Sequence, residues 1–307
     1  MSASKLITLV RRELWETRSL VWVPLATVLL ILIGAVLSST LSGGVQVNID
    51  GDDSIFWDAL ASDPVRQSQF FAVWISALLI PVLLVATIVV FFYLADSLYS
   101  ERKDRSVLFW KSLPVSDLST VGSKVFTALV AVPLWTWLLS LLLGLGVFGV
   151  IALRYSGTAL DPVTDFHFGV WLAAQGRLLL NLAIASMWYA PIAGYLLIVS
   201  VLARRAPALW IGLPPLALAF AEKAVFDTGH VLKYLGYRLS AFFQAFDPSL
   251  DFPSERGIDQ AMRTIEYAYG HLSAARLLTE PQLWLGVLVA AALIWLAARL
   301  RRWHDDG

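Results

Sequence analysis

Apolar runs long enough to cross a lipid bilayer recur along the whole chain. A spanning helix needs about 20 mostly apolar residues, because each residue adds about 1.5 Å and the hydrocarbon layer is about 30 Å thick. Six segments meet or nearly meet this length, namely Leu20–Leu41, Phe70–Ala95, Val125–Leu153, Leu178–Leu202, Ala208–Phe226 and Leu283–Leu300. We therefore predict an all-α polytopic membrane protein with six transmembrane helices in a single transmembrane domain, residues 1–307.

Composition supports this prediction. Hydrophobic residues make up 58% of the chain and charged residues only 15%, against about 25% charged residues in water-soluble domains. A net charge of zero gives no indication of nucleic-acid binding. The sequence contains no cysteine, which excludes disulfides and thiolate metal sites.

The distribution of basic residues predicts the orientation. Cytoplasmic loops of membrane proteins are enriched in Lys and Arg. If the N-terminus is cytoplasmic, the inner segments hold 14 of the 23 basic residues. The first outer loop is acidic, with Asp50, Asp52, Asp53, Asp58 and Asp63. We predict that both termini are cytoplasmic.

Three segments outside the spans have patterns of their own. Residues 1–19 mix apolar and basic residues, as expected for an amphipathic helix lying in the inner membrane interface. Residues 96–124 form a cytoplasmic loop, and residues 227–281 form an extracytoplasmic loop. In the latter, apolar residues recur at helical spacing, which predicts an amphipathic helix with Ser254 as its N-cap and Pro281 as its stop. These apolar residues are Ile258, Met262, Ile265, Tyr269 and Leu272.

The cytoplasmic loop combines a dense charge cluster with an apolar run. Charged residues fill positions 101–105, and the apolar run 107–110 ends in Phe109 and Trp110. Ser116 can cap the next helix, with Asp117 in its first turn. An exposed apolar patch on a cytosolic loop favours a docking site for a cytosolic protein. The alternative is that Phe109 and Trp110 lie against the bilayer surface as interfacial anchors.

The stretch Glu101–Lys124, with the pattern ER-x-x-RS-x-x-FWKSLP-x-S, resembles the type-2 permease family of ATP-binding-cassette (ABC) transporters. The resemblance implies a coupling helix in this loop that a separate ATPase subunit receives in a groove. Phe109 and Trp110 would form the wedge and Lys111 would adjoin it. Glu101, Arg102 and Arg105 would be the polar partners.

Membership of this family would define the rest of the assembly. Two permease protomers, identical or different, would bind two ATPase subunits in a bacterial inner membrane and act as an exporter. ATP and Mg²⁺ would be bound by the ATPase, and this chain would need no cofactor. Two alternatives are a non-transport membrane anchor for a cell-envelope ATPase complex and an intramembrane enzyme.

Sequence motifs for chemistry in this chain are absent. It contains no G-x-x-x-x-G-K-[ST], no H-E-x-x-H and no G-x-S-x-G, and its four His are scattered. We therefore expect no catalytic residue and no metal site in the chain, and we assign ATP hydrolysis to the partner.

The fifth predicted span contains a candidate outer gate. Its uncharged part, Ala206–Ala221, is shorter than the hydrocarbon thickness. Glu222 and Lys223 therefore fall in or near its outer half, and Lys223 can reach Asp227 one helical turn later. The alternative is that both side chains snorkel to the headgroups. The prolines at 207, 214 and 215 predict an irregular helix.

Polar and small residues within other spans predict helix packing. Gln175 and Asn181 are expected to form interhelical hydrogen bonds. Three glycines, Gly144, Gly146 and Gly149, are expected to allow close helix approach, and Pro133 and Pro191 are expected to kink the third and fourth spans.

Overall fold

The computed structural model describes residues 3–41, 59–104, 116–157, 167–203, 206–244 and 258–303. In these ranges every regular element is a helix, and six helices are long and apolar enough to cross a membrane. The protein is thus an all-α, multi-pass membrane protein by the length and composition of its helices.

The helices extend beyond the predicted spans at most of their ends. The bounds are α1 Ala3–Glu16, α2 Ser19–Leu41, α4 Pro64–Leu78, α5 Ile80–Lys103, α7 Asp117–Phe126, α8 Val132–Tyr155, α10 Phe168–Leu202, α11 Pro207–Phe226, α12 His230–Gln244, α13 Ile258–Gly270 and α14 Pro281–Trp303. A π-helical segment, Thr127–Ala131, joins α7 to α8 directly before Pro133, where the sequence predicts a kink. Segment α10 continues through Pro191.

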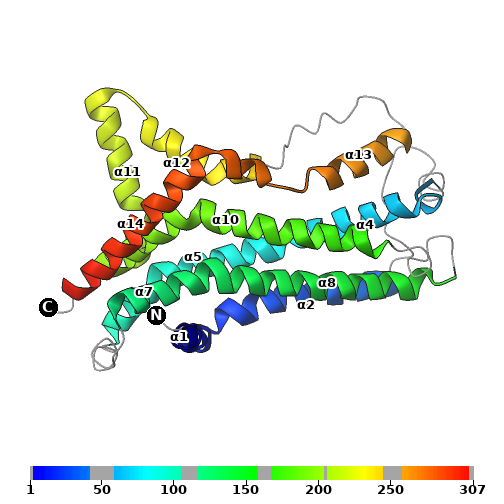
Figure 1. Ribbon diagram of the computed structural model, residues 1–307, viewed down its shortest axis with the longest axis horizontal. Coiled ribbons are helices and arrows are strands. Elements are labelled where there is room, and N and C mark those ends of the chain that lie inside the picture. The colour runs from blue at the N-terminus through cyan, green and yellow to red at the C-terminus, as the bar shows by residue number, and fades with distance from the viewer. Residues whose placement is uncertain are drawn as a thin grey trace.

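Three long helical segments, α4–α5, α7–α8 and α10, form the core of the bundle (Figure 1). The pairs α4–α5 and α7–α8 run beside α2 and α10, and α14 packs along α10. The segment Pro64–Lys103 has 40 residues, or about 60 Å of helix, which is twice the hydrocarbon thickness. The shorter helices α2 and α14 pack along different parts of this length. Helix α2 contacts α5 and α8, whereas Leu283 at the start of α14 packs against Ile184 and Trp188 of α10.

Several landmarks of the chain meet at one end of the bundle, which we call the terminal end. Both chain termini lie there in Figure 1, with α1 and the last turns of α5 and α14. The first turn of α7 lies there too, so this end carries both flanks of the segment 105–115. We call the opposite end, where α4 begins and α8 ends, the far end.

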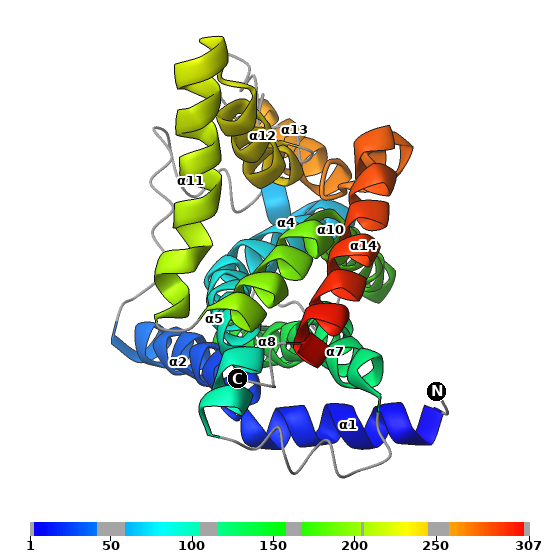
Figure 2. The same ribbon diagram turned by 90° about the vertical axis from the view of Figure 1, so that its left-hand side faces the viewer.

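Helix α11 differs from the prediction in direction and in regularity. It runs across the bundle axis (Figures 1 and 2), and its apolar side chains are widely exposed, with Phe220 at 77%. The Pro214–Pro215 pair does not break it, and the predicted irregularity is limited to the helical hydrogen bonds that these prolines remove. These prolines leave the carbonyls of the preceding turn without a helical donor, and the hydroxyl of Tyr195 lies 3.1 and 2.9 Å from the Trp210 and Ile211 carbonyl oxygens.

The loop 227–281 contains more structure than the sequence predicted. Helix α13 confirms the apolar pattern, because Met262, Ile265 and Tyr269 are buried and α13 packs on α4. Ser254 lies outside the described residues. Pro281 begins α14 and does not end α13, which stops at Gly270. Helix α12 was not predicted; its Arg238 stacks on Trp188 of α10 at 4.2 Å.

The predicted packing contacts are largely confirmed. The Gln175 side-chain oxygen accepts a hydrogen bond from Ser140 at 2.8 Å. The Asn181 oxygen accepts from the Ala274 backbone amide at 2.9 Å, in the connection between α13 and α14, so this hydrogen bond is not the interhelical one expected. Two of the three glycines permit close approach, since Gly144 lies against Trp171 and Gly146 against Leu32, whereas nothing lies within 4 Å of a Cβ placed at Gly149.

Candidate functional site

Six ionisable side chains from four helices form a charge cluster at the terminal end of the bundle. The members are Arg12 and Glu13 of α1, Glu101 of α5, Asp117 and Lys124 of α7, and Arg301 of α14. Three cations balance three anions, and the more exposed Glu16 and Arg302 pair with Arg12 and Asp117 at the edge of the cluster, at 3.3 and 3.9 Å. Four members are almost completely buried, namely Glu13, Glu101, Lys124 and Arg301.

Lys124 is the centre of the cluster. Its ammonium lies 3.0 Å from Glu13 Oε2 and 2.9 Å from Glu101 Oε1. A guanidinium nitrogen of Arg12 contacts the same two carboxylates at 2.7 and 3.2 Å. The Tyr93 hydroxyl donates a further hydrogen bond to Glu13 Oε2 at 2.8 Å. Two helices that flank the segment 105–115 are thereby joined to the N-terminal helix.

Arg301 connects the last helix to this centre. Its guanidinium lies 3.0 Å from Glu101 Oε2 and 3.3 Å from Asp117 Oδ1. Figure 2, which looks at this end, shows α1 running crosswise along the lower edge of the bundle and the end of α14 lying beside α7. The charge cluster therefore holds α1, α5, α7 and α14 together at one level.

Burial determines how firmly the cluster couples these helices. A buried ion pair gains little net stability over an apolar pair, but loss of one partner leaves an uncompensated charge and costs about 3–5 kcal/mol. Each carboxylate of the cluster contacts at least one cation within 3.3 Å. Displacing one helix therefore requires the others to follow or the ion pairs to separate.

The cluster lies at the base of the predicted docking loop. Glu101 is in the last turn of α5, and Asp117 is in the first turn of α7, directly after the N-cap Ser116. The Ser116 hydroxyl accepts a hydrogen bond from the Ser119 amide at 3.2 Å, as the sequence predicted. The cluster therefore includes residues on both sides of the segment 105–115.

The predicted docking residues fall into two groups. Four of them lie outside the described residues, namely Arg105, Phe109, Trp110 and Lys111. The other two bind within the chain. Glu101 is part of the charge cluster, and Arg102 donates to the Ser200 and Ala203 carbonyl oxygens at 2.7 and 3.0 Å. These two residues thus fix α5 to its neighbours.

The three candidate gate residues lie together at the exposed turn between α11 and α12. Lys223 contacts Asp227 at 2.6 Å, which is the contact expected from their spacing, and both side chains are exposed. Glu222 accepts hydrogen bonds from the His230 and Val231 amides at 2.7 and 2.8 Å. Its carboxylate therefore caps the N-terminus of α12.

Sequence reasoning missed the three partners of Glu101, which are Arg12, Lys124 and Arg301, and the burial of Glu13 beside them. Lys124 and Arg301 stand at the ends of long apolar runs, and Glu13 stands among the apolar residues of the amphipathic segment 4–18. A charge at such a position must reach water or find a partner. That signal marks the residues, but it does not show which of them meet.

Comparisons with known proteins identify no relative. Neither a family model, nor a curated protein, nor a solved structure matches the chain. Among the described residues, no group of three His, Asp or Glu side chains is arranged to hold a metal ion.

Proposed function

We propose that this chain is the membrane-spanning permease subunit of an ABC transporter. A separate ATPase subunit binds the segment 105–115, with Phe109 and Trp110 as the anchoring side chains. The protein works as an exporter in a bacterial inner membrane, with its termini in the cytoplasm and a second permease protomer completing the path. The chain itself hydrolyses no ATP.

The observation that carries the proposal is the charge cluster at both ends of the loop. A loop that only anchors the protein to the membrane surface has no need of a buried connection to α1 and α14. The cluster gives the ATPase a rigid contact with four helices, through Glu101 before the loop and Asp117 and Lys124 after it. The sequence motif of residues 101–124 supports the same assignment.

The mechanism follows from this connection. ATP binding and hydrolysis in the partner displace the segment 105–115. The displacement moves α5 and α7, and the ion pairs pass the movement to α1 and α14. Because α5 and α7–α8 are long continuous segments, a tilt at the terminal end changes their spacing at the far end. A path between two protomers then opens alternately to the two sides.

Co-purification and ATP turnover test the proposal. The full chain is purified with its ATPase from the cells that make it, and Trp110→Asp is compared with Trp303→Asp. Trp303 is the matched control, because it is an exposed tryptophan, 72% accessible, at the same end of the bundle. We expect Trp110→Asp to lose the ATPase subunit or its stimulation by the permease, and Trp303→Asp to keep both. Retention of assembly and ATP turnover in Trp110→Asp would refute the docking role.

A further inference from the structure

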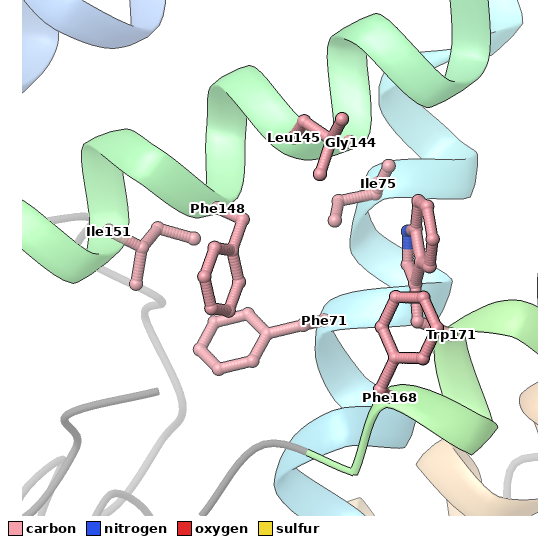
Figure 3. Close-up of a pocket in the computed structure, with 8 residues that line it drawn as sticks. All are labelled: Phe71, Ile75, Gly144, Leu145, Phe148, Ile151, Phe168 and Trp171. Atoms are coloured by element: carbon pink, nitrogen blue, oxygen red, sulfur yellow. The ribbon is translucent and has the colours of Figure 1, made fainter. Parts of the chain in front are cut away.

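Two cavities of similar volume differ in the chemistry of their walls. The first, of about 220 Å³ between α4, α8 and α10, is lined by apolar side chains such as Phe71, Ile75 and Phe148, and none of its lining residues is charged (Figure 3). The second, of about 240 Å³, lies at the terminal end between the first turn of α7 and the last turns of α14, which Figure 2 shows side by side. We call it the terminal pocket, and its main lining residues are Asp117, Leu118, Trp295, Arg299 and Arg302.

The terminal pocket carries an excess of positive charge. Its one acidic lining residue, Asp117, belongs to the charge cluster, where it contacts Arg301 at 3.3 Å and Arg302 only at 3.9 Å. No carboxylate in the described ranges pairs with Arg299, whose guanidinium carbon lies 4.8 Å from the centre of the Trp295 ring. The six residues of the charge cluster are neutral together, so Arg299 and Arg302 add two positive charges that the cluster does not balance.

The two arginines present their charges on one face of α14. Arg299 and Arg302 are three residues apart, which makes their side chains neighbours on a helix, and both are exposed and line the pocket. Like charges at this spacing repel, and an anion between them turns the repulsion into two attractions. Guanidinium groups bind phosphate oxygens through paired, charge-assisted hydrogen bonds. The arrangement therefore suits a phosphate group.

The terminal pocket lies where the apolar parts of two candidate spans end. Leu20 in the first turn of α2 belongs to the same core cluster as Ala297 and Ala298 near the end of α14. Both spans therefore reach one level at the terminal end, although they pack along different parts of the bundle towards the far end. Basic residues begin directly beyond this level, with Arg18 before α2 and Arg299 in α14.

Exposed tryptophans mark the same level. Trp22 near the start of α2 and Trp295 and Trp303 near the end of α14 are 63%, 53% and 72% exposed. Tryptophan and basic side chains gather at the membrane–water interface of spanning helices, which is where phospholipid phosphates lie. We propose that the terminal pocket binds the phosphate group of a membrane phospholipid, with Arg299 and Arg302 contacting its oxygens. This inference does not depend on the proposed transport function.

Native mass spectrometry of the purified full chain tests the site. The protein is stripped of lipid in detergent and titrated at fixed ionic strength with phosphatidylglycerol, whose headgroup carries a phosphate and no cation. We expect Arg299→Gln combined with Arg302→Gln to lower the affinity for the first bound lipid about tenfold, the effect of losing one charge-assisted hydrogen bond. The control, Arg11→Gln combined with Arg18→Gln, removes two exposed arginines at the same end but outside the pocket. It should leave the affinity nearly unchanged.

Two further measurements make the result specific. Leu118→Glu places a carboxylate at the exposed edge of the pocket without removing an arginine, and it should also weaken the first lipid. This surface variant decides the question if the double arginine variant fails to fold. Glycerol 3-phosphate carries the phosphate without acyl chains and should compete with the lipid only weakly.

Three outcomes would overturn the proposal. Equal losses of affinity in the pocket variant and the control would mean that only the general positive charge of this end attracts lipid. Competition by glycerol 3-phosphate as strong as that by the lipid would mean that the pocket takes a soluble phosphate compound. Unchanged lipid binding in the Arg299→Gln, Arg302→Gln variant would mean that the pocket is no lipid site, and loss of a co-purifying subunit from that variant would assign it to a protein contact.

Discussion

Removal of the Lys124 ammonium is the sharpest perturbation of the charge cluster. Lys124→Met keeps the length and much of the volume of the side chain but removes the cation that lies about 3 Å from both Glu13 and Glu101. At that separation, and with an effective dielectric constant of about 20, each contact is worth about 5 kcal/mol before desolvation is subtracted. Arg12 and Arg301 still contact the carboxylates. We therefore expect the free energy of unfolding to fall by about 3–5 kcal/mol, as for other buried ion pairs that lose one partner.

The protein contains a matched control for this experiment. Lys223 also pairs with a carboxylate, at 2.6 Å from Asp227, but the two side chains are 65% and 90% exposed. An exposed pair contributes about 0–1 kcal/mol, so Lys223→Met should lower stability by no more than that. The double variant Lys124→Met with Glu13→Gln should recover part of the loss, because it removes the one carboxylate charge that Arg12 and Arg301 do not balance.

Unfolding in mixed micelles, followed by circular dichroism of the helices, measures these differences. The reasoning predicts that Lys124→Met loses several times more stability than Lys223→Met. Equal and small losses in the two variants would refute it, because they would mean that water reaches the Lys124 site and that the cluster does not couple its helices.

Three further predictions concern contacts outside the charge cluster. Gly194→Ala should destabilise the protein by about 1–3 kcal/mol, because the new Cβ would lie 2.9 Å from Leu293 Cβ and 3.4 Å from the Ala290 carbonyl oxygen. Gly176→Ala in the same helix meets nothing within 4 Å and should be neutral or stabilising. Thermal unfolding distinguishes the two variants, and equal unfolding midpoints would contradict the α10–α14 contact. Tyr195→Phe should speed amide exchange in the first half of α11, because it removes the hydroxyl that donates to two carbonyls left without a helical donor by the prolines. Tyr234→Phe, at an exposed position, should not change the exchange. Unchanged exchange in Tyr195→Phe would mean that Tyr195 does not hold α11. Glu222→Ala should speed amide exchange at the first residues of α12, since it removes their acceptor, and protection equal to that of the parent protein would show that the cap is dispensable.

The six long helices could be predicted from the sequence because long apolar runs indicate segments that lie in lipid. All six predicted segments correspond to helices that are long and apolar enough to span. Their ends were less predictable, since α5 and α7 continue into polar residues that pair with one another. In the sequence, Glu101 and Lys124 were interpreted as charges of a cytoplasmic loop. In the structure both side chains are buried and contact one another at 2.9 Å.

Other features depend on contacts that periodicity cannot show. The Pro214–Pro215 pair indicated a broken helix, and the helix persists where the Tyr195 hydroxyl lies within reach of the freed carbonyls. Helix α12 was missed because residues 230–244 are too short and too polar for a transmembrane span. The direction of α11 likewise depends on its left-handed end residues, Ala206 and Asp227, at φ values of 46° and 50°.

The central claim is that the segment 105–115 docks an ATP-hydrolysing subunit, and site-specific crosslinking tests it most directly. The chain contains no cysteine, so Trp110→Cys creates a unique attachment point for a benzophenone probe, and Trp303→Cys provides a control at the same end of the bundle. In membranes from cells that make the partner, the account predicts that position 110 crosslinks to one soluble protein that binds and hydrolyses ATP, and that position 303 does not. Crosslinks from position 110 to lipid or to the chain itself, with no nucleotide-binding protein attached, would contradict it.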